Sequence, residues 1–180
     1  MQKRLEDLNK KIMAWGDARK ITTNGNVAMQ LLKLNEEFLK EFYESNGDEE
    51  KIKDSIGDSM VVLTMIDGIV NNDDFLEVLR DVNYDDDILR YYGDNSTWCS
   101  DLICHNIGAM SSIAVRNKVE EQKKEFNIRL IHCYELLMIL ALSLDLCPID
   151  CLEHAYNEIK DRKGELLPNG VFVKESDLKA

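Results

Sequence analysis

Proline is almost absent from this chain, and its scarcity restricts the fold more than any other feature of the sequence. The 180 residues contain two prolines, Pro148 and Pro168, so no proline interrupts a helix before Pro148. Apolar residues recur at helical spacing along most of the length, and a strand pattern is confined to residues 170–174. The sequence therefore predicts an all-α protein with a single helical domain, residues 1–180, because this length suits one hydrophobic core.

Apolar spacing and turn residues predict where the helices lie. We expect a first amphipathic helix that ends near Gly16, and an asparagine, Asn26, that caps the next one. Pro148 suits the first turn of the last helix. The helices expected after the first span residues 26–43, 49–71, 98–119, 126–144 and 148–163.

Net charge and cysteine usage restrict the partners and the compartment. The formal net charge is −12 and the pI is about 4.7, which argues against a nucleic-acid or anionic-membrane surface. The longest apolar run, residues 136–144, is too short to cross a bilayer, and the charged N-terminus shows no signal peptide. Five cysteines, an odd number without paired spacing, indicate reduced thiols. We expect a cytoplasmic protein with no nucleic-acid or membrane partner.

The second and third expected helices carry acids beside their apolar residues. At 100° per residue, Gln30, Glu37 and Glu41 lie along the edge of one apolar stripe, and Asp54 and Asp58 lie on a second apolar face of the next helix. A partly buried carboxylate needs a counter-charge, a proton or a bound cation. The pattern therefore predicts a hard divalent cation held by oxygen ligands. A solvated groove lined by the same acids is the alternative that helical spacing leaves open.

Several segments at the two ends of the chain resemble one enzyme family. They are Trp15, Arg19, Asn26, Gln30, KLNEE at 33–37, KDSIGD at 53–58, VVL at 61–63, AYNEIKDRKG at 155–164 and NGVFVKE at 169–175. This combination is similar to the all-α nucleoside triphosphate pyrophosphohydrolases of the phage-type MazG-like group. The resemblance implies a four-helix-bundle core, Mg²⁺ held by acids, and hydrolysis of a (deoxy)nucleoside triphosphate to the monophosphate and pyrophosphate.

The acidic signature of that family is matched only in part. It has two glutamates, two further residues and a third glutamate, and then, after a spacer, a glutamate followed three positions later by an aspartate. Lys40 and Ser55 stand at two of these acid positions. Glu41 and Asp54 lie one residue from each gap, so the resemblance leaves both a shifted ligand set and a loss of activity open. The implied catalytic residues are Glu36, Glu37, Glu41 and Asp58, and the implied metal ligands are Glu37, Glu41, Asp54 and Asp58.

The resemblance also implies residues that contact the substrate. These are Trp15, Arg19, Gln30, Lys33, Asn157, Arg162, Lys163 and Lys174. Trp15 would stack on the base, and the basic residues would contact the phosphates. A core role for the tryptophan and a solvated or ion-paired role for each base are the alternatives. Cys147, Cys151 and His154 share a helical face, but without a second ligand cluster we expect buried thiols rather than a zinc site.

The chain is longer than a minimal member of that family. We interpret residues 72–97, which are rich in aspartate, as an acidic insertion with a solvated surface. Residues 98–160 resemble a degenerate second helical repeat, as in the fused arrangement of the dimeric dUTPases, and a plain insertion is the alternative. We expect a homo-oligomer, most simply a dimer. A catalytically inactive bundle that binds a protein partner through the acidic insertion is the competing functional hypothesis.

Overall fold

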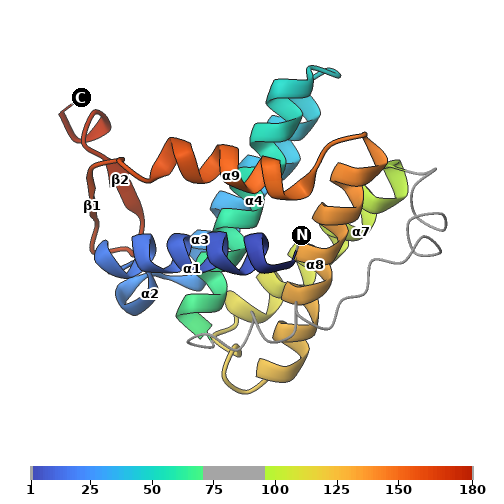
Figure 1. Ribbon diagram of the computed structural model, residues 1–180. Helices are drawn as coiled ribbons and strands as arrows, with labels where there is room; N and C mark the ends of the chain where they lie inside the picture. The colour runs from blue at the N-terminus through green and yellow to red at the C-terminus, as the bar shows by residue number, and fades with distance from the viewer. Residues whose placement is uncertain (1, 71–95, 180) are drawn as a thin grey trace.

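The structure is a computed structural model that describes residues 2–70 and 96–179, and its fold is all-α, as predicted (Figure 1). The helices are α1 (Gln2–Ala18), α2 (Ile21–Asn24), α3 (Val27–Asn35), η1 (Glu36–Phe42), α4 (Glu49–Val70), α7 (Ser96–Ala114), α8 (Lys123–Ser143), α9 (Pro148–Ile159) and η2 (Asp177–Lys179). The strands β1 (Gly164–Leu166) and β2 (Phe172–Lys174) pair antiparallel. The acidic insertion predicted over residues 72–97 lies outside the described residues, except for its last two residues, which belong to α7.

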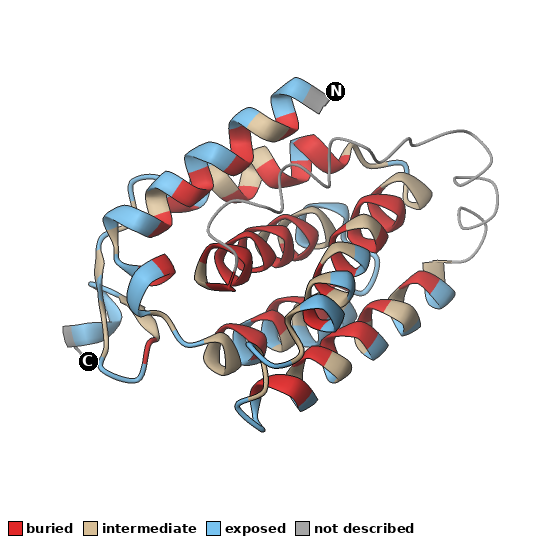
Figure 2. Ribbon diagram, turned by 90° about the horizontal axis from the view of Figure 1, so that it is seen from below, coloured by how far each residue is buried: buried red, intermediate tan, exposed pale blue. Residues whose placement is uncertain are grey.

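Helix α4 is the centre of the fold. It contacts α1, α2, α3, η1, α8 and α9, and every residue from Ser55 to Val70 except Asp58 and Ile69 is buried (Figure 2). The prediction that this helix is apolar on two sides is confirmed. Because α4 is surrounded from Ser55 onwards, Asp58 lies against packed neighbours rather than on an open face.

Two helical pairs form the bundle. Helices α3 and α4 form one pair and α7 and α8 the other, and the pairs meet through contacts of α3 with α7 and of α4 with α8. That the second pair is a degenerate copy of the first stays a prediction. Helix α9 crosses α4 and contacts α1 and α8, and the β1–β2 hairpin follows it at the edge of the molecule (Figure 1).

A close approach of backbones fixes the crossing of α4 and α9. At Gly57 an added Cβ would overlap the carbonyl oxygen of Cys151 and would lie 2.9 Å from the Cβ of Ala155. Only glycine leaves room for this contact. The crossing determines how the end of α9 and the strands after it lie beside the acids of α4.

Several helix boundaries differ from the predicted ones. The predicted helix over residues 98–119 ends at Ala114, because Asn117 adopts a left-handed conformation with φ of 55° and the backbone N–H of Lys118 bonds the Ile113 carbonyl at 3.1 Å. The predicted helix over residues 148–163 ends at Ile159, and strand β1, which the sequence analysis did not predict, begins at Gly164. The predicted cap is confirmed, since the Asn26 side chain accepts from the Met29 N–H at 3.2 Å.

Helix α8 is the one helix among the described residues that is long and apolar enough to cross a membrane. By length and composition it would pass as a membrane span, but 56% of its most apolar window is buried inside the fold. Its Tyr134 hydroxyl bonds Asn9 of α1, and Asn9 also accepts from Thr64 of α4 at 2.7 Å. These contacts are those of a helix in the core of the bundle.

Candidate metal and nucleotide site

A π-helix carries the first set of predicted acids. The single helix predicted over residues 26–43 is α-helical only to Asn35, and the next seven residues, Glu36–Phe42, form the π-helix η1. Isolated π segments are rare and occur frequently at functional sites. The π-helix includes Glu37, whose residue is only 4% exposed, and the partly exposed Glu41.

The acids of η1 and α4 lie close enough to affect one another. Burial, together with the charges of Glu37 and Asp54, raises the pKa of Asp58 to about 7. Burial also raises the pKa of Glu41 to about 7, with contributions from the charge of Glu37, a hydrogen bond to it, and the charge of Asp54. Four predicted metal ligands therefore form one electrostatically coupled cluster, which we call the acid cluster: Glu37, Glu41, Asp54 and Asp58.

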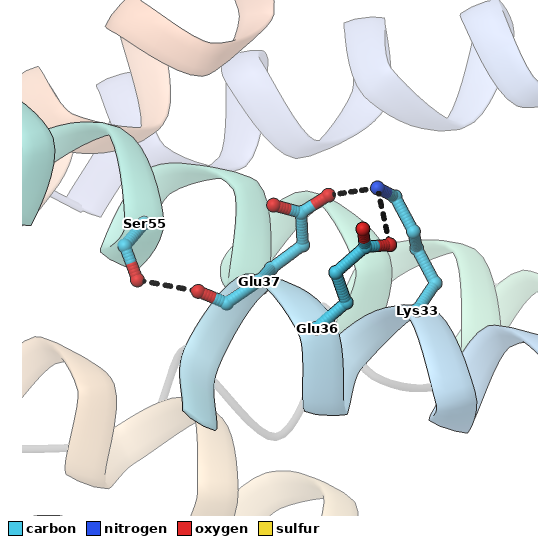
Figure 3. Close-up of polar contacts among 4 residues, drawn as sticks. All are labelled: Lys33, Glu36, Glu37 and Ser55. Carbon is cyan, nitrogen blue, oxygen red and sulfur yellow. Dashed lines mark hydrogen bonds and ion pairs between the residues drawn. The ribbon is translucent and has the colours of Figure 1, made fainter. Parts of the chain in front are cut away.

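A lysine supplies the nearest positive charge to the buried member of the cluster. The Lys33 ammonium pairs with Glu37 and, at 3.1 Å, with Glu36 (Figure 3). Burial lowers the pKa of Lys33, but the hydrogen bonds and charges of the two glutamates outweigh it, so that the pKa lies above its ordinary value. Lys33, predicted to contact phosphate, thus lies at the acids, and Glu36 lies at the exposed edge of the group.

Helix α9 and the residues after it bring two more side chains to the cluster. The charge of Arg162 lowers the pKa of Asp58, so this predicted phosphate-binding residue lies within electrostatic range of a predicted metal ligand. The His154 Nε2 lies 3.5 Å from the Asp54 carboxylate. The approach of His154 was not predicted, because it depends on the crossing of α9 over α4, which no local spacing in the sequence reveals.

Trp15 of α1 and Arg19, just after its end, lie near the backbone of Arg162. The Arg19 guanidinium stacks 4.5 Å from the centre of the Trp15 ring and donates to the Arg162 carbonyl at 2.6 and 3.2 Å. Phe172 of β2 packs edge-on against Trp15 with ring centres 5.7 Å apart. The tryptophan is half-buried, and its indole N–H is a buried donor that has no hydrogen-bond partner among residues 2–70 and 96–179. Aromatic and basic groups therefore gather at the backbone of Arg162.

The other predicted substrate residues are spread around the site. Gln30 is buried in α3, whereas Asn157, Lys163 and Lys174 are exposed. Asn157 accepts from Lys160 at 2.9 Å. The structure therefore brings Lys33 and Arg162 to the acids, and it leaves these four residues outside that contact group.

Ser55 has a role that the sequence analysis did not anticipate. Its hydroxyl is fully buried and donates to the backbone carbonyl of Glu37 at 2.6 Å (Figure 3). Ser55 stands at a position where the family signature has an acid. A serine here connects α4 to the π-helix instead of adding a charge.

A separate cavity of about 500 Å³ lies on another side of η1. Its walls are mostly apolar and include Phe38, Phe42 and Ile52, with Cys104 from α7 and Leu144 after α8. None of the predicted site residues lines it. The acid cluster, not this cavity, is the place where charge and candidate ligands meet.

The donor set of the acid cluster suits a hard cation, although its side chains are not already arranged as ligands. Within residues 2–70 and 96–179, no three histidine, cysteine, aspartate or glutamate side chains stand in a ready metal-binding geometry. All five cysteines are free in the structure. Comparison with family models, curated proteins and solved structures gave no match to this chain.

Proposed function

We propose that this protein is a Mg²⁺-dependent hydrolase that cleaves a (deoxy)nucleoside triphosphate into a nucleoside monophosphate and pyrophosphate, a reaction that maintains the nucleotide pool. The gathering of Glu37, Glu41, Asp54 and Asp58 from two helices is the observation that carries the proposal. Four carboxylates with few bases among them are the oxygen ligands that Mg²⁺ prefers. Free, reduced thiols suit the cytoplasm, where such substrates occur.

The residues around the cluster suit a triphosphate. When bound, Mg²⁺ would neutralise phosphate oxygens and lower the pKa of a bound water. Lys33 and Arg162 would contact the phosphates, because both already lie beside the acids. Glu36, at the exposed edge, would orient the attacking water. Glu41 and Asp58, each with a pKa of about 7, would release their protons as the cation enters.

Pyrophosphate release tests this function. The protein is incubated with each of the common ribo- and deoxyribonucleoside triphosphates and Mg²⁺, and pyrophosphate is quantified. We expect release from at least one nucleotide, and loss of about two orders of magnitude or more in Asp58→Ala, because a metal ligand stabilises the transition state by several kcal/mol. Glu44→Gln, at an exposed acid outside the cluster, is the matched control. Release that Asp58→Ala leaves unchanged would exclude this site.

An exposed apolar stripe favours a second candidate function. Leu32, Leu39 and Tyr43 are 61%, 42% and 85% exposed along α3, η1 and the residue that follows. Exposed apolar side chains on one face are typical of an interaction surface. A catalytically inactive bundle that binds a protein through this stripe is the alternative, and a homo-oligomer formed through it is compatible with both functions. Absence of pyrophosphate release from every nucleotide would favour the alternative.

A further inference from the structure

The third acid position of the family signature is occupied by Lys40, yet the structure has an acid next to Glu37. In an α-helix, residue 40 would lie about 60° to one side of Glu37 and residue 41 about 40° to the other side. A π-helix advances less per residue, since its hydrogen bonds span five residues rather than four. The wider turn therefore swings Glu41 towards the side that residue 40 would hold in an α-helix and turns Lys40 away from it.

We infer that the π-helix absorbs one inserted residue, that Glu41 thereby serves as the third acid of the site, and that Ser55 is a positioning residue which holds the π-helix against α4. The inference rests on the proposed function, because it assigns places in the same metal site. Exposure agrees with it: Lys40 is exposed, whereas Glu41 is partly buried and hydrogen-bonded to Glu37.

The two departures from the signature are thus connected. Ser55 donates to the carbonyl of Glu37, a backbone group inside the π-helix, at 2.6 Å. A carboxylate at position 55 would be fully buried and would accept rather than donate, so it would repel this carbonyl. When the helix gains a residue at the first acid motif, a hydrogen-bond donor at position 55 of the second motif is therefore favoured over an acid. The same argument makes Glu41 and Asp54, not residues 40 and 55, the ligands that accompany Glu37 and Asp58.

Binding of Mn²⁺ tests the register, by which we mean the assignment of Glu41 rather than residue 40 as the third acid. Binding is measured without nucleotide, by titration calorimetry and by the electron paramagnetic resonance signal of the free ion. Lys40→Glu restores the literal signature, but we expect the Mn²⁺ dissociation constant to stay within about twofold of the original, because position 40 faces solvent. Deletion of Lys40 should convert η1 to an α-helix with Glu41 in the same place, so we expect a folded protein with affinity within about threefold. Deletion of the exposed Leu32, in the regular helix α3, is the control and should disrupt folding.

Two serines of α4 test the positioning role. Ser59 is buried like Ser55, but its hydroxyl has no hydrogen-bond partner in the part of the chain that the structure describes, so Ser59→Ala is a matched control. We expect Ser55→Ala to weaken Mn²⁺ binding about fivefold or more and Ser59→Ala to leave it unchanged.

Three results would overturn the inference: tighter Mn²⁺ binding by Lys40→Glu, an unfolded protein after deletion of Lys40, or equal Mn²⁺ affinities of Ser55→Ala and Ser59→Ala. Expected Mn²⁺ results without pyrophosphate release by the original protein would refute the proposed function and leave the register intact. Pyrophosphate release combined with any of the three results would refute the register alone.

Discussion

Asp58 is an acid whose pKa in the folded protein lies well above its value in water. Burial, followed by the charges of Glu37 and Asp54, raises its pKa from 3.8 to about 7. The folded protein therefore holds a proton between these pH values that the unfolded chain has released. Because the folded state binds more protons in this range, the free energy of unfolding falls as pH rises from about 4 to about 7 and is constant above it. Asp58→Asn keeps the shape of the side chain and removes this fall in the free energy of unfolding.

The size of the effect follows from the same pKa. Each pKa unit corresponds to about 1.4 kcal/mol, so the displacement from 3.8 to about 7 corresponds to about 4 kcal/mol above pH 7. Water still reaches part of Asp58, which reduces the cost to about 2 kcal/mol. At about 2–4 °C per kcal/mol for a protein of this size, we expect Asp58→Asn to melt about 4–8 °C higher than the original protein at pH 8.

Thermal melts at two pH values, with EDTA or with 10 mM Mg²⁺, are the assay. At pH 8 in EDTA the variant should melt higher, and near pH 4 the two proteins should melt together, because Asp58 is then protonated in the folded protein. Mg²⁺ should stabilise the original protein by about 2.7 kcal/mol when its concentration is 100 times the dissociation constant, and should not stabilise the variant. Glu44→Gln, at an exposed acid, should change neither melt.

Opposite effects of one substitution separate a metal site from a solvated groove. If Asp58→Asn stabilises the protein in EDTA and also abolishes the stabilisation by Mg²⁺, then Asp58 destabilises the folded state without a cation and contributes to binding the cation when it is present. Identical melting of Asp58→Asn and the original protein at pH 8, with and without Mg²⁺, would refute the reasoning and favour the solvated groove.

Three further substitutions test the fold that supports the site. Gly57→Ala should cost about 1–3 kcal/mol, because the new methyl overlaps the Cys151 carbonyl, and calorimetry should show a lower melting temperature. Gly108→Ala should raise the free energy of unfolding by about 0.5–1 kcal/mol, since a Cβ there meets nothing within 4 Å and Ala favours the helix. A lower melting temperature would contradict this. Tyr134→Phe should cost about 1–3 kcal/mol, because Asn9 loses a buried partner at 3.0 Å, and an unchanged denaturant midpoint would contradict this.

Local sequence patterns predicted the parts of the structure that depend on local geometry. The helical class followed from the scarcity of proline and from apolar spacing, and the Asn26 cap followed from residue type. The two apolar sides of α4 followed from its composition, and a surrounded helix was the only arrangement that could bury both. The acids Asp54 and Asp58 then had to lie near packed neighbours. Each of these inferences needed only the spacing of residues within one helix.

The parts that escaped prediction depend on contacts between elements distant in sequence. The approach of His154 to Asp54 requires the crossing of α9 over α4, and that crossing depends on the absence of a side chain at Gly57. The stacking of Arg19 between Trp15 and the Arg162 carbonyl likewise joins the two ends of the chain. The end of α7 was misplaced because Asn117 adopts a left-handed conformation, which residue type permits but does not require.

The π-helix shows why counting positions in a motif is not enough. Motif positions identify side chains only while the helix keeps its regular advance per residue, and one wide turn changes the correspondence for every residue after it. Counted against the signature that the sequence resembles, Lys40 and Ser55 stand at two acid positions. In the structure, Lys40 is exposed and Ser55 donates to the carbonyl of Glu37. The sequence contained a signal for this, because Glu41 follows the lysine directly. An acid displaced by one residue from its expected position is therefore a reason to examine the helix for a π turn before inferring that the site is lost.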